Sequence, residues 1–407
     1  KAYFDEVSYS QLTIDSTFYP TPPGGTVVSY QDAQPRAYYQ PYDAVTNPTG
    51  YTNDRTSREH TLLKNAVNAV SSQVPGSLDV DADSVGYVDS VVFIIKGEGD
   101  GWSDLLWPHK WALYTQSAFI NGARVWEYNF QLSAWLGVGV LCHEMFHTLG
   151  APDLYHYGAE WRYLQPVRKW DLMEYNLNPP QHMLMHMKRR YGGWIASIPE
   201  ITSSGTYTLN PNTSSTNNAY RIASPNSSTE YFVVEYRKKE GTFEGGIPGT
   251  GLLVYRIDTT LEGNASGPPD EVYVYRPGGT TTVNGSPDSA HYSLDEGRTE
   301  INDSTNPSSF LQNGSPGGLD ISNISAAGDT ISFDVTMSVE DDFTVSASPE
   351  TLQVCKGQDA DFEVSVGQVG SFTGSVSLLT SGRPVGSTAG FSPNPVNPTP
   401  GASTLTI

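Results

Sequence analysis

The sequence predicts an α+β protein built from three successive parts. Over residues 1–200, helix-like and strand-like patterns alternate. From 201 to 338, short runs of alternating apolar and polar residues follow one another, separated by turns rich in Asn, Gly, Ser and Pro. A shorter strand-rich tail occupies 339–407. The length of 407 residues suits two to three domains at ~150 residues each.

The first part contains three predicted helices and one predicted strand. Residues 58–71 carry apolar side chains at helical spacing. Residues 86–97 form a short β-branched run that is typical of a buried strand. Residues 132–150 are apolar almost all round and predict a buried helix that ends at Gly150. Residues 179–193 begin with proline and end with a glycine pair, which indicates another helix.

The remaining parts are predicted to be all-β. Residues 201–338 show no helical period, and their strand patterns favour a β-sandwich. The acidic segment 338–342 (SVEDD) is expected to be a short linker. The tail predicts an immunoglobulin-like module. Because the chain stops at Ile407 within an apparent strand, we expect this module to be incomplete.

Composition favours an exported, loop-rich protein. There are 23 Lys and Arg against 44 Asp and Glu, a net charge of -21, so nucleic acid and anionic membrane surfaces are poor partners. No apolar run approaches the ~18 residues of a membrane span. Lys1 opens directly into the first pattern without a signal segment, so export would require that this segment was removed or not included. Cys142 and Cys355 fall in different predicted parts and are expected to stay unpaired.

A possible metal site lies on the predicted helix 132–150. His143 and His147 are four residues apart, so both imidazoles face one side and could bind one zinc ion, with Glu144 beside them as general base. Gly150 can reverse the chain and bring Asp153 back as a third ligand. Glu174 competes for this role at a longer spacing, but the short spacer favours Asp153.

The sequence HEMFHTLGAPDLY (143–155), followed by WDLM (170–173), resembles the immune inhibitor A-like family of secreted bacterial zinc metallopeptidases. The resemblance covers about 1–338 and includes YFDEVSYSQL (3–12), GYVDSVVFIIKG (86–97), WPHKW (107–111), GGW (192–194), YFVVEYR (231–237), PGTGLLVYRID (248–258) and GLDISNIS (318–325). It implies a metzincin-like catalytic domain over 1–200, with His143, His147 and Asp153 as ligands and Glu144 as base. It also implies that Met173 lies under the metal. Tyr175 is either a donor to the developing oxyanion or a tyrosine packed beside the cleft.

Three other histidines are weaker candidates. His182 and His186 are also four residues apart, but no glutamate follows His182, and the cations at 188–190 would repel a metal ion. Packing or a place in the cleft wall suits them better. His109 is expected to be structural or at the rim of the site.

The loop DADSVGYVD (81–89) resembles a calcium loop, with Asp81, Asp83 and Asp89 as oxygen ligands. Val85 stands where a further acidic ligand would be needed, so we expect a weak or empty Ca²⁺ site and favour an acidic turn. A structural Ca²⁺ ion elsewhere on this acidic surface is not located by the sequence.

Two functions are compatible with these residues. The first is a secreted, extracellular, monomeric zinc endopeptidase that acts on protein or peptide substrates. The alternative is a catalytically retired protease scaffold that serves as an extracellular binding or adhesion protein, since nearly half the chain is β modules. Retention of both histidines, the glutamate and a third carboxylate favours the enzyme.

Overall fold

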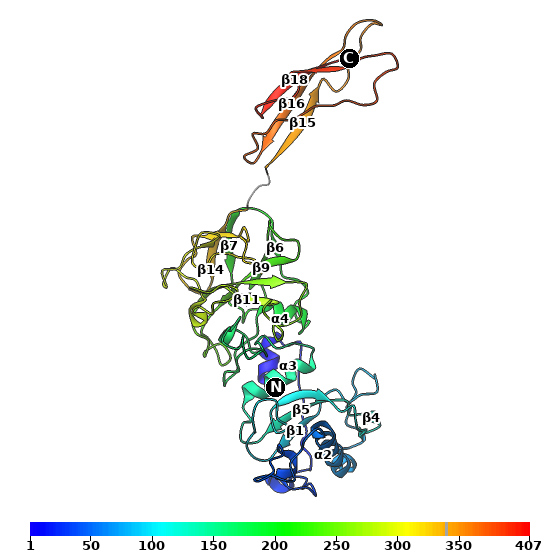
Figure 1. Ribbon diagram of the computed structural model, residues 1–407, viewed down its shortest axis with the longest axis vertical. Helices are drawn as coiled ribbons and strands as arrows, with labels where there is room; N and C mark the ends of the chain where they lie inside the picture. Colours follow the sequence, from blue (N-terminus) through cyan, green and yellow to red (C-terminus); the bar gives the residue numbers. More distant parts are fainter. Residues whose placement is uncertain (338–340) are drawn as a thin grey trace. The chain divides into compact units, whose positions relative to one another are not determined.

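A computed structural model describes residues 1–337 and 341–407 of the chain. It divides into two compact units, Lys1–Thr336 and Met337–Ile407 (Figure 1). The sequence suggests 1–200 and 201–338 as separate domains. The first unit contains all of 1–200 together with residues 201–336. Residues 338–340 of the predicted linker lie outside the described residues. The structure is mostly sheet with few helices, which is compatible with the β-rich architecture predicted for residues 201–407.

The helices of the described residues all lie within 1–200, apart from one short 3-10 turn. The α-helices are α1 (Ala2–Val7), α2 (Arg55–Val70), α3 (Val138–Thr148) and α4 (Met185–Arg190). The 3-10 turns are Pro23–Gly25, Arg36–Tyr39, Ser71–Gln73, Arg168–Trp170 and Pro287–Ser289. Helix α2 confirms the helix predicted at 58–71.

Two predicted helices are shorter than expected. Helix α3 begins at Val138, because Leu132 still belongs to a strand and a turn follows it. Its first turn packs so closely on Leu177 that a Cβ on Gly139 would lie 2.1 Å from the Leu177 carbonyl oxygen. Helix α4 begins at Met185 rather than near Pro179, because other elements bind the backbone before it: Glu244 accepts from His182 N–H at 2.8 Å and Asp171 accepts from Leu184 N–H at 2.7 Å.

A small mixed sheet carries helix α3 on one side. Its strands are β1 (Val92–Ile95), β5 (Glu127–Leu132) and β2 (His109–Ala112), in the order β1-β5-β2, with β1 parallel and β2 antiparallel to β5. Strands β3 (Phe119–Ile120) and β4 (Ala123–Arg124) form a hairpin that is a separate two-stranded sheet. The strand predicted over 86–97 is limited to β1, and it is only partly buried: Ile94 is 44% exposed.

Residues 201–336 form two further sheets. The first has the order β11-β10-β9-β8-β6 and comprises β6 (Glu200–Ile201), β8 (Ala219–Ala223), β9 (Glu230–Arg237), β10 (Gly251–Asp258) and β11 (Val272–Val274). The second has the order β12-β13-β14-β7 and comprises β7 (Gly205–Leu209), β12 (Ile301–Asn302), β13 (Asp320–Ser322) and β14 (Ile331–Val335). Strands β9 and β10 pair over their full eight residues.

One hydrophobic core joins helix α3 to the five-stranded sheet. Cys142 and Phe146 of α3 belong to the same buried cluster as Val233 of β9 and Tyr255 of β10. A second cluster lies between α2 and the small sheet. Helix α3 therefore lies between the small sheet and the β-rich part (Figure 1), and residues 1–200 share their main core with residues 201–336.

The second unit is a four-stranded sheet in the order β15-β16-β18-β17. Its strands are β15 (Asp342–Ser348), β16 (Asp361–Val369), β17 (Gly390–Ser392) and β18 (Gly401–Thr406). Residues 374–379 form no strand, and Val376 makes a single bridge to Val396. Five buried side chains form its small core: Val364, Val366, Val376, Leu378 and Val396.

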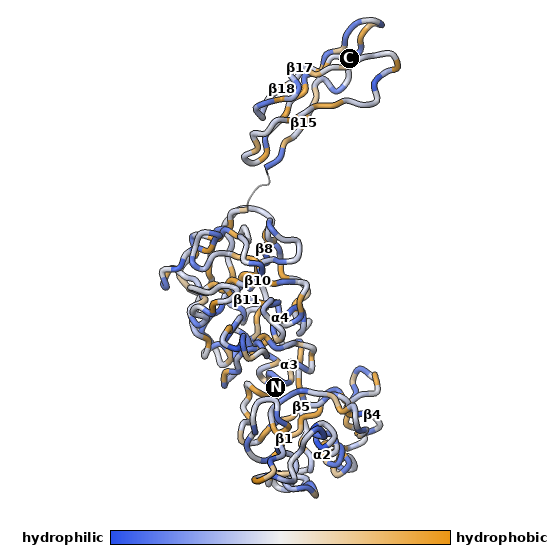
Figure 2. The backbone as a smooth tube through the Cα atoms, viewed as in Figure 1, coloured by the Kyte–Doolittle hydropathy of each residue, from blue (hydrophilic) through white to orange (hydrophobic). Residues whose placement is uncertain are grey.

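Apolar residues occur along the chain in short stretches (Figure 2). No helix of the described residues has the length and apolar character needed to cross a membrane. Cys142 is buried, Cys355 is exposed, and both are free thiols, as predicted.

Candidate metal centre

Helix α3 places two histidines one turn apart on the same face. The rings of His143 and His147 are nearly perpendicular, with centroids 4.8 Å apart. Cys142 and Phe146, each one residue before a histidine, lie on a different face and pack into the core. Gly150, with φ +95°, ends the helix in the left-handed region and turns the chain back.

The returning chain brings Asp153 to both histidines, as the sequence predicts. Its Oδ1 atom lies 3.0 Å from Nε2 of His143 and 3.3 Å from Nε2 of His147. The three possible ligand atoms all lie within 4.8 Å of one another. Two ligand atoms bound ~2.0–2.1 Å from one tetrahedral ion lie ~3.3 Å apart, so these separations suit one small cation.

Backbone carbonyls hold both imidazoles in the orientation that metal binding needs. Nδ1 of His143 donates to the Leu172 carbonyl at 3.0 Å, and Nδ1 of His147 donates to the Ala151 carbonyl at 2.6 Å. Since a carbonyl can only accept, each Nδ1 carries the proton and each neutral ring keeps a lone pair on Nε2. Both lone pairs are on the side where Asp153 lies.

The two oxygens of Asp153 have different surroundings. Oδ2 accepts a hydrogen bond from the Tyr157 hydroxyl. Oδ1 is buried and accepts no hydrogen bond of normal geometry, although it lies near two ring nitrogens. A buried carboxylate oxygen without a partner is costly unless a cation satisfies it. The two imidazoles and one carboxylate therefore fit a zinc ion, and three protein ligands leave one position for water.

Charge at this centre is strongly coupled. Burial disfavours a charged His143, but the carboxylates of Asp153 and Glu144 outweigh it and raise the pKa of the imidazole to about 9. Burial also disfavours ionised Asp153, yet His143 and His147 hold the pKa of that carboxyl well below its usual range. The carboxylate therefore favours a cation beside it, and protons compete with a metal ion for the imidazoles.

Glu144 follows His143 on α3 and is buried, with 7% of its surface exposed. Among the described residues, no hydrogen bond is donated to its carboxylate, in contrast to Asp153. Its oxygens are thus not engaged in holding the fold. A carboxylate that accepts no hydrogen bond and follows a candidate metal ligand is free to accept a proton.

The backbone of residues 172–173 supports two of the ligands. The Leu172 carbonyl orients His143 through the bond to its Nδ1. The Met173 carbonyl accepts a hydrogen bond from Leu154 N–H at 3.0 Å, directly after Asp153. Met173 itself is fully buried in the main core. This segment therefore braces the centre through its main chain.

Glu174 binds backbone groups rather than the ligand cluster, and Tyr175 packs against two cationic side chains. Oε2 of Glu174 accepts from the N–H groups of Val167 and Arg168 at 2.6 and 2.5 Å. The Tyr175 ring is 41% exposed and lies under the cationic groups of Arg168 and Lys169, 5.3 and 5.7 Å from its centroid. Asp153, and not Glu174, is brought to the histidines.

A pocket of about 350 Å³ opens beside the segment that carries Asp153. Tyr155 and Trp102 contribute aromatic walls, Leu164 adds an apolar surface, and Glu174 also lines it. The Tyr155 ring stacks near His143, with centroids 6.5 Å apart. Tyr155 therefore lines the pocket and also contacts His143.

The histidines of the second i, i+4 pair are occupied by fixed partners. His182 contacts Glu6 at 2.9 Å and Lys188 at 3.0 Å. His186 contacts Glu271 at 2.7 Å, so the two rings serve different polar contacts rather than one ligand set.

His109 is also held on both sides of its ring. It lies between Glu59, at 2.9 Å, and the Trp107 carbonyl, at 2.6 Å. The ring stacks on Phe130, with centroids 5.1 Å apart. These contacts give it a structural role.

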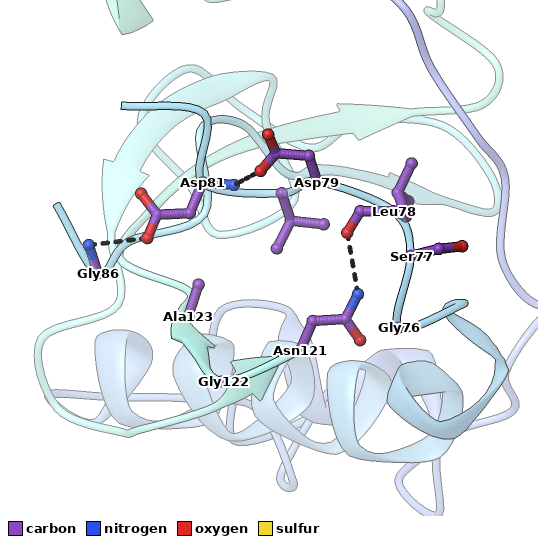
Figure 3. Close-up of a pocket in the computed structure, with 10 residues that line it drawn as sticks. Gly76, Ser77, Leu78, Asp79, Asp81, Gly86, Asn121, Gly122 and Ala123 are labelled. Carbon is purple, nitrogen blue, oxygen red and sulfur yellow. Dashed lines mark hydrogen bonds between the residues drawn. The ribbon is translucent and has the colours of Figure 1, made fainter. Parts of the chain in front are cut away.

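The acidic turn brings Asp81, Asp83 and Asp89 together, with one oxygen of each within 4.8 Å of the others. Both carboxylate oxygens of Asp81 already accept backbone hydrogen bonds, from Val85 at 3.0 Å and Gly86 at 2.9 Å. Figure 3 shows Asp81 in the wall of a shallow pocket of about 430 Å³, opposite Asn121. These bonds stabilise the turn and favour its interpretation as an acidic turn.

Sequence reasoning misses Tyr157, whose hydroxyl binds the third ligand. It also misses the two carbonyls that orient the histidines. A tyrosine four residues after Asp153 has no regular spacing to signal this contact, because the segment is a loop. Backbone acceptors leave no trace in side-chain patterns.

Comparisons with protein-family models, with curated proteins and with solved structures found no match to this chain.

Proposed function

We propose that this protein is a secreted zinc-dependent endopeptidase of the immune inhibitor A-like type, with a metzincin-like catalytic part. The observation that carries the proposal is the convergence of His143, His147 and Asp153 around a buried oxygen without a hydrogen-bond partner. The helical spacing of the histidines and the nearby Glu144 complete the residue set of a peptide-hydrolysing zinc site.

In this proposal, the two Nε2 atoms and Oδ1 of Asp153 would hold the ion. When bound, zinc supplies Lewis-acid activation of water and of the substrate carbonyl. Glu144 accepts the proton that the attacking water loses and returns it to the leaving amine. Tyr175, which is 41% exposed, is our candidate donor to the developing oxyanion.

The surroundings of the centre suit a peptide substrate. In this proposal, the pocket with Tyr155, Trp102 and Leu164 in its walls receives an apolar side chain of the peptide. Exposed aromatic residues continue from it: Trp102 and Tyr157 are 43% and 44% exposed. These surfaces favour protein or peptide substrates over small polar ones.

Hydrolysis of casein tests the proposal. The purified chain should cleave casein, lose activity with a chelator and regain it with Zn²⁺. Glu144→Ala should bind zinc as the wild type does but hydrolyse ~10²–10⁴-fold more slowly, because only the general base is lost.

If Glu144→Ala keeps more than a tenth of wild-type turnover, the role of Glu144 as general base is contradicted. A wild type that binds zinc but cleaves neither casein nor gelatin would favour the alternative of a binding or adhesion protein.

A further inference from the structure

A loop of the β-rich part lies directly against the segment that carries Asp153. We call residues 151–157 the ligand loop and residues 261–271, which join β10 to β11, the clamp loop. Asn264 N–H donates to the Asp153 carbonyl at 2.9 Å, and Tyr157 N–H donates to the Ala265 carbonyl at 2.9 Å. The clamp loop thus binds the backbone of the ligand loop at Asp153 itself and four residues after it.

The Asn264 side chain connects the ligand loop to strand β11. Its Nδ2 donates to the Leu154 carbonyl at 3.1 Å and to the Val272 carbonyl at 2.9 Å. Its Oδ1 accepts from Val272 N–H at 3.1 Å. Asn264 is fully buried, so these bonds are shielded from water. The amide therefore fixes the ligand loop to a strand.

A buried contact between two side chains adds to this attachment. Nε2 of His156 lies 2.6 Å from Oδ1 of Asp270, and Nδ1 of His156 lies 3.1 Å from the Trp161 carbonyl. His156 and Asp270 are 2% and 5% exposed. This pair joins the ligand loop to the end of the clamp loop.

The approach of the two loops requires a glycine. Gly263 has φ +68°, and a Cβ there would lie 2.6 Å from Cβ of Pro152 and 2.9 Å from the Asp153 carbonyl oxygen. Any side chain would push the ligand loop away from its position or force the clamp loop back.

The clamp loop is itself anchored to helix α4. Oε1 of the buried Glu271 contacts His186 and Arg190, each at 2.7 Å, and its Oε2 accepts from Tyr191 at 2.9 Å and from Gly263 N–H. Gly263 and Asn264 are thus bound to Glu271 and Val272, and Glu271 is held by residues of helix α4 and the tyrosine after it, which makes the loop a rigid support.

We propose that the clamp loop positions Asp153 for metal binding, with Gly263 and Asn264 as positioning residues. The β-rich part then contributes to the affinity for the metal, in addition to sharing the core. This inference rests on the proposed zinc centre.

The test compares two glycine variants that carry the same backbone strain. Gly263→Ala places a methyl group against the ligand loop. Gly297→Ala is the control, because Gly297 has φ +66° and nothing lies within 4 Å of its Cβ position. Zinc affinity is measured by competition with a chromophoric chelator, and folding by circular dichroism and thermal unfolding.

A second pair removes a buried amide rather than adding a methyl group. Asn264→Ala is compared with Asn212→Ala, since both residues are fully buried in the β-rich part and only Asn264 contacts the ligand loop. This pair decides the outcome if Gly263→Ala unfolds.

The two clamp-loop variants should bind zinc ~10–100-fold more weakly than their controls, at equal secondary structure, because residues that orient ligands typically contribute that much. Equal affinity in clamp-loop variants and controls, with a wild type that binds zinc, would overturn this inference alone. A wild type that binds no zinc would overturn the proposed function, and this inference with it.

Discussion

At the scale of single residues, the candidate centre depends on which atoms are already engaged. Each histidine donates from Nδ1 to a carbonyl, and Asp153 accepts from Tyr157 through Oδ2. The atoms left over, two Nε2 and one Oδ1, are the ones that converge. Three separate polar contacts thus aim three ligand atoms at one point.

Substitution of the two competing carboxylates separates their roles. Asp153→Ala should lose zinc and activity together, because it removes the atom that lies between the histidines. Glu174→Gln should retain its zinc, since its carboxylate binds the backbone of Val167 and Arg168. Zinc content of the two purified variants, measured by atomic absorption, checks this. Loss of zinc in Glu174→Gln with retention in Asp153→Ala would reverse the assignment.

The buried Lys188 predicts how the free energy of unfolding depends on pH. Burial is the main cause that lowers the pKa of its ammonium to about 7, although nearby carboxylates oppose it. Between pH 7 and 9 the unfolded chain keeps this proton and the folded chain does not, so the free energy of unfolding should rise with pH by about 2–3 kcal/mol. Lys188→Met should lack this rise in urea titrations at the two pH values. A parallel rise in both proteins would contradict the prediction.

The ligand residues could be predicted from sequence because they are local. Helical spacing links His143 to His147, and one glycine brings back Asp153 six residues later. The supports could not be predicted: Leu172 is 29 residues from His143, and Asn264 is 110 residues from Leu154. Such contacts depend on tertiary packing, which has no local pattern.

At the scale of elements, the sequence predicts which segments are helical better than where they begin. The apolar run from residue 132 continues through the end of β5 into α3, so hydrophobicity alone shows no boundary between them. The start of α4 is delayed because the N–H groups of His182 and Leu184 donate to Glu244 and Asp171, which lie outside this segment. Helix α2 spans Arg55–Val70, close to the predicted range 58–71, because no strand adjoins this amphipathic segment.

The start of α3 offers a test at this scale. Gly139→Ala should destabilise the fold by about 1–3 kcal/mol, because its Cβ would meet a backbone oxygen of Leu177 at 2.1 Å. Gly137→Ala is the matched control, since its nearest neighbour, Asn178, would be 3.7 Å away. Chemical denaturation compares them. Equal stability would show that the segment at Leu177 can move without cost.

At the scale of the whole molecule, residues 1–336 form one compact unit and the tail forms another. The α3 core includes Val233 and Leu253, so the predicted catalytic part does not close its core without the β-rich part. The tail has its own core of five buried side chains. Removal of the tail and removal of the β-rich part are therefore expected to have different effects.

Removal of residues 341–407 should leave hydrolysis of small peptides nearly unchanged, because no ligand or support of the metal centre lies there. Removal of 201–336 should instead give insoluble or inactive protein, since buried apolar surface on α3 becomes exposed. Solubility and peptide turnover of the two truncated chains check both statements. A soluble and active fragment 1–200 would refute the second.

Whether His143, His147 and Asp153 form a catalytic zinc site can be decided by titrating metal-free protein with Zn²⁺ while peptide hydrolysis is measured. We expect activity to rise in proportion to bound zinc and to saturate at one zinc per chain, and we expect no such rise in Asp153→Ala. Zinc binding without hydrolysis, or hydrolysis that persists in metal-free protein, would contradict the proposed site.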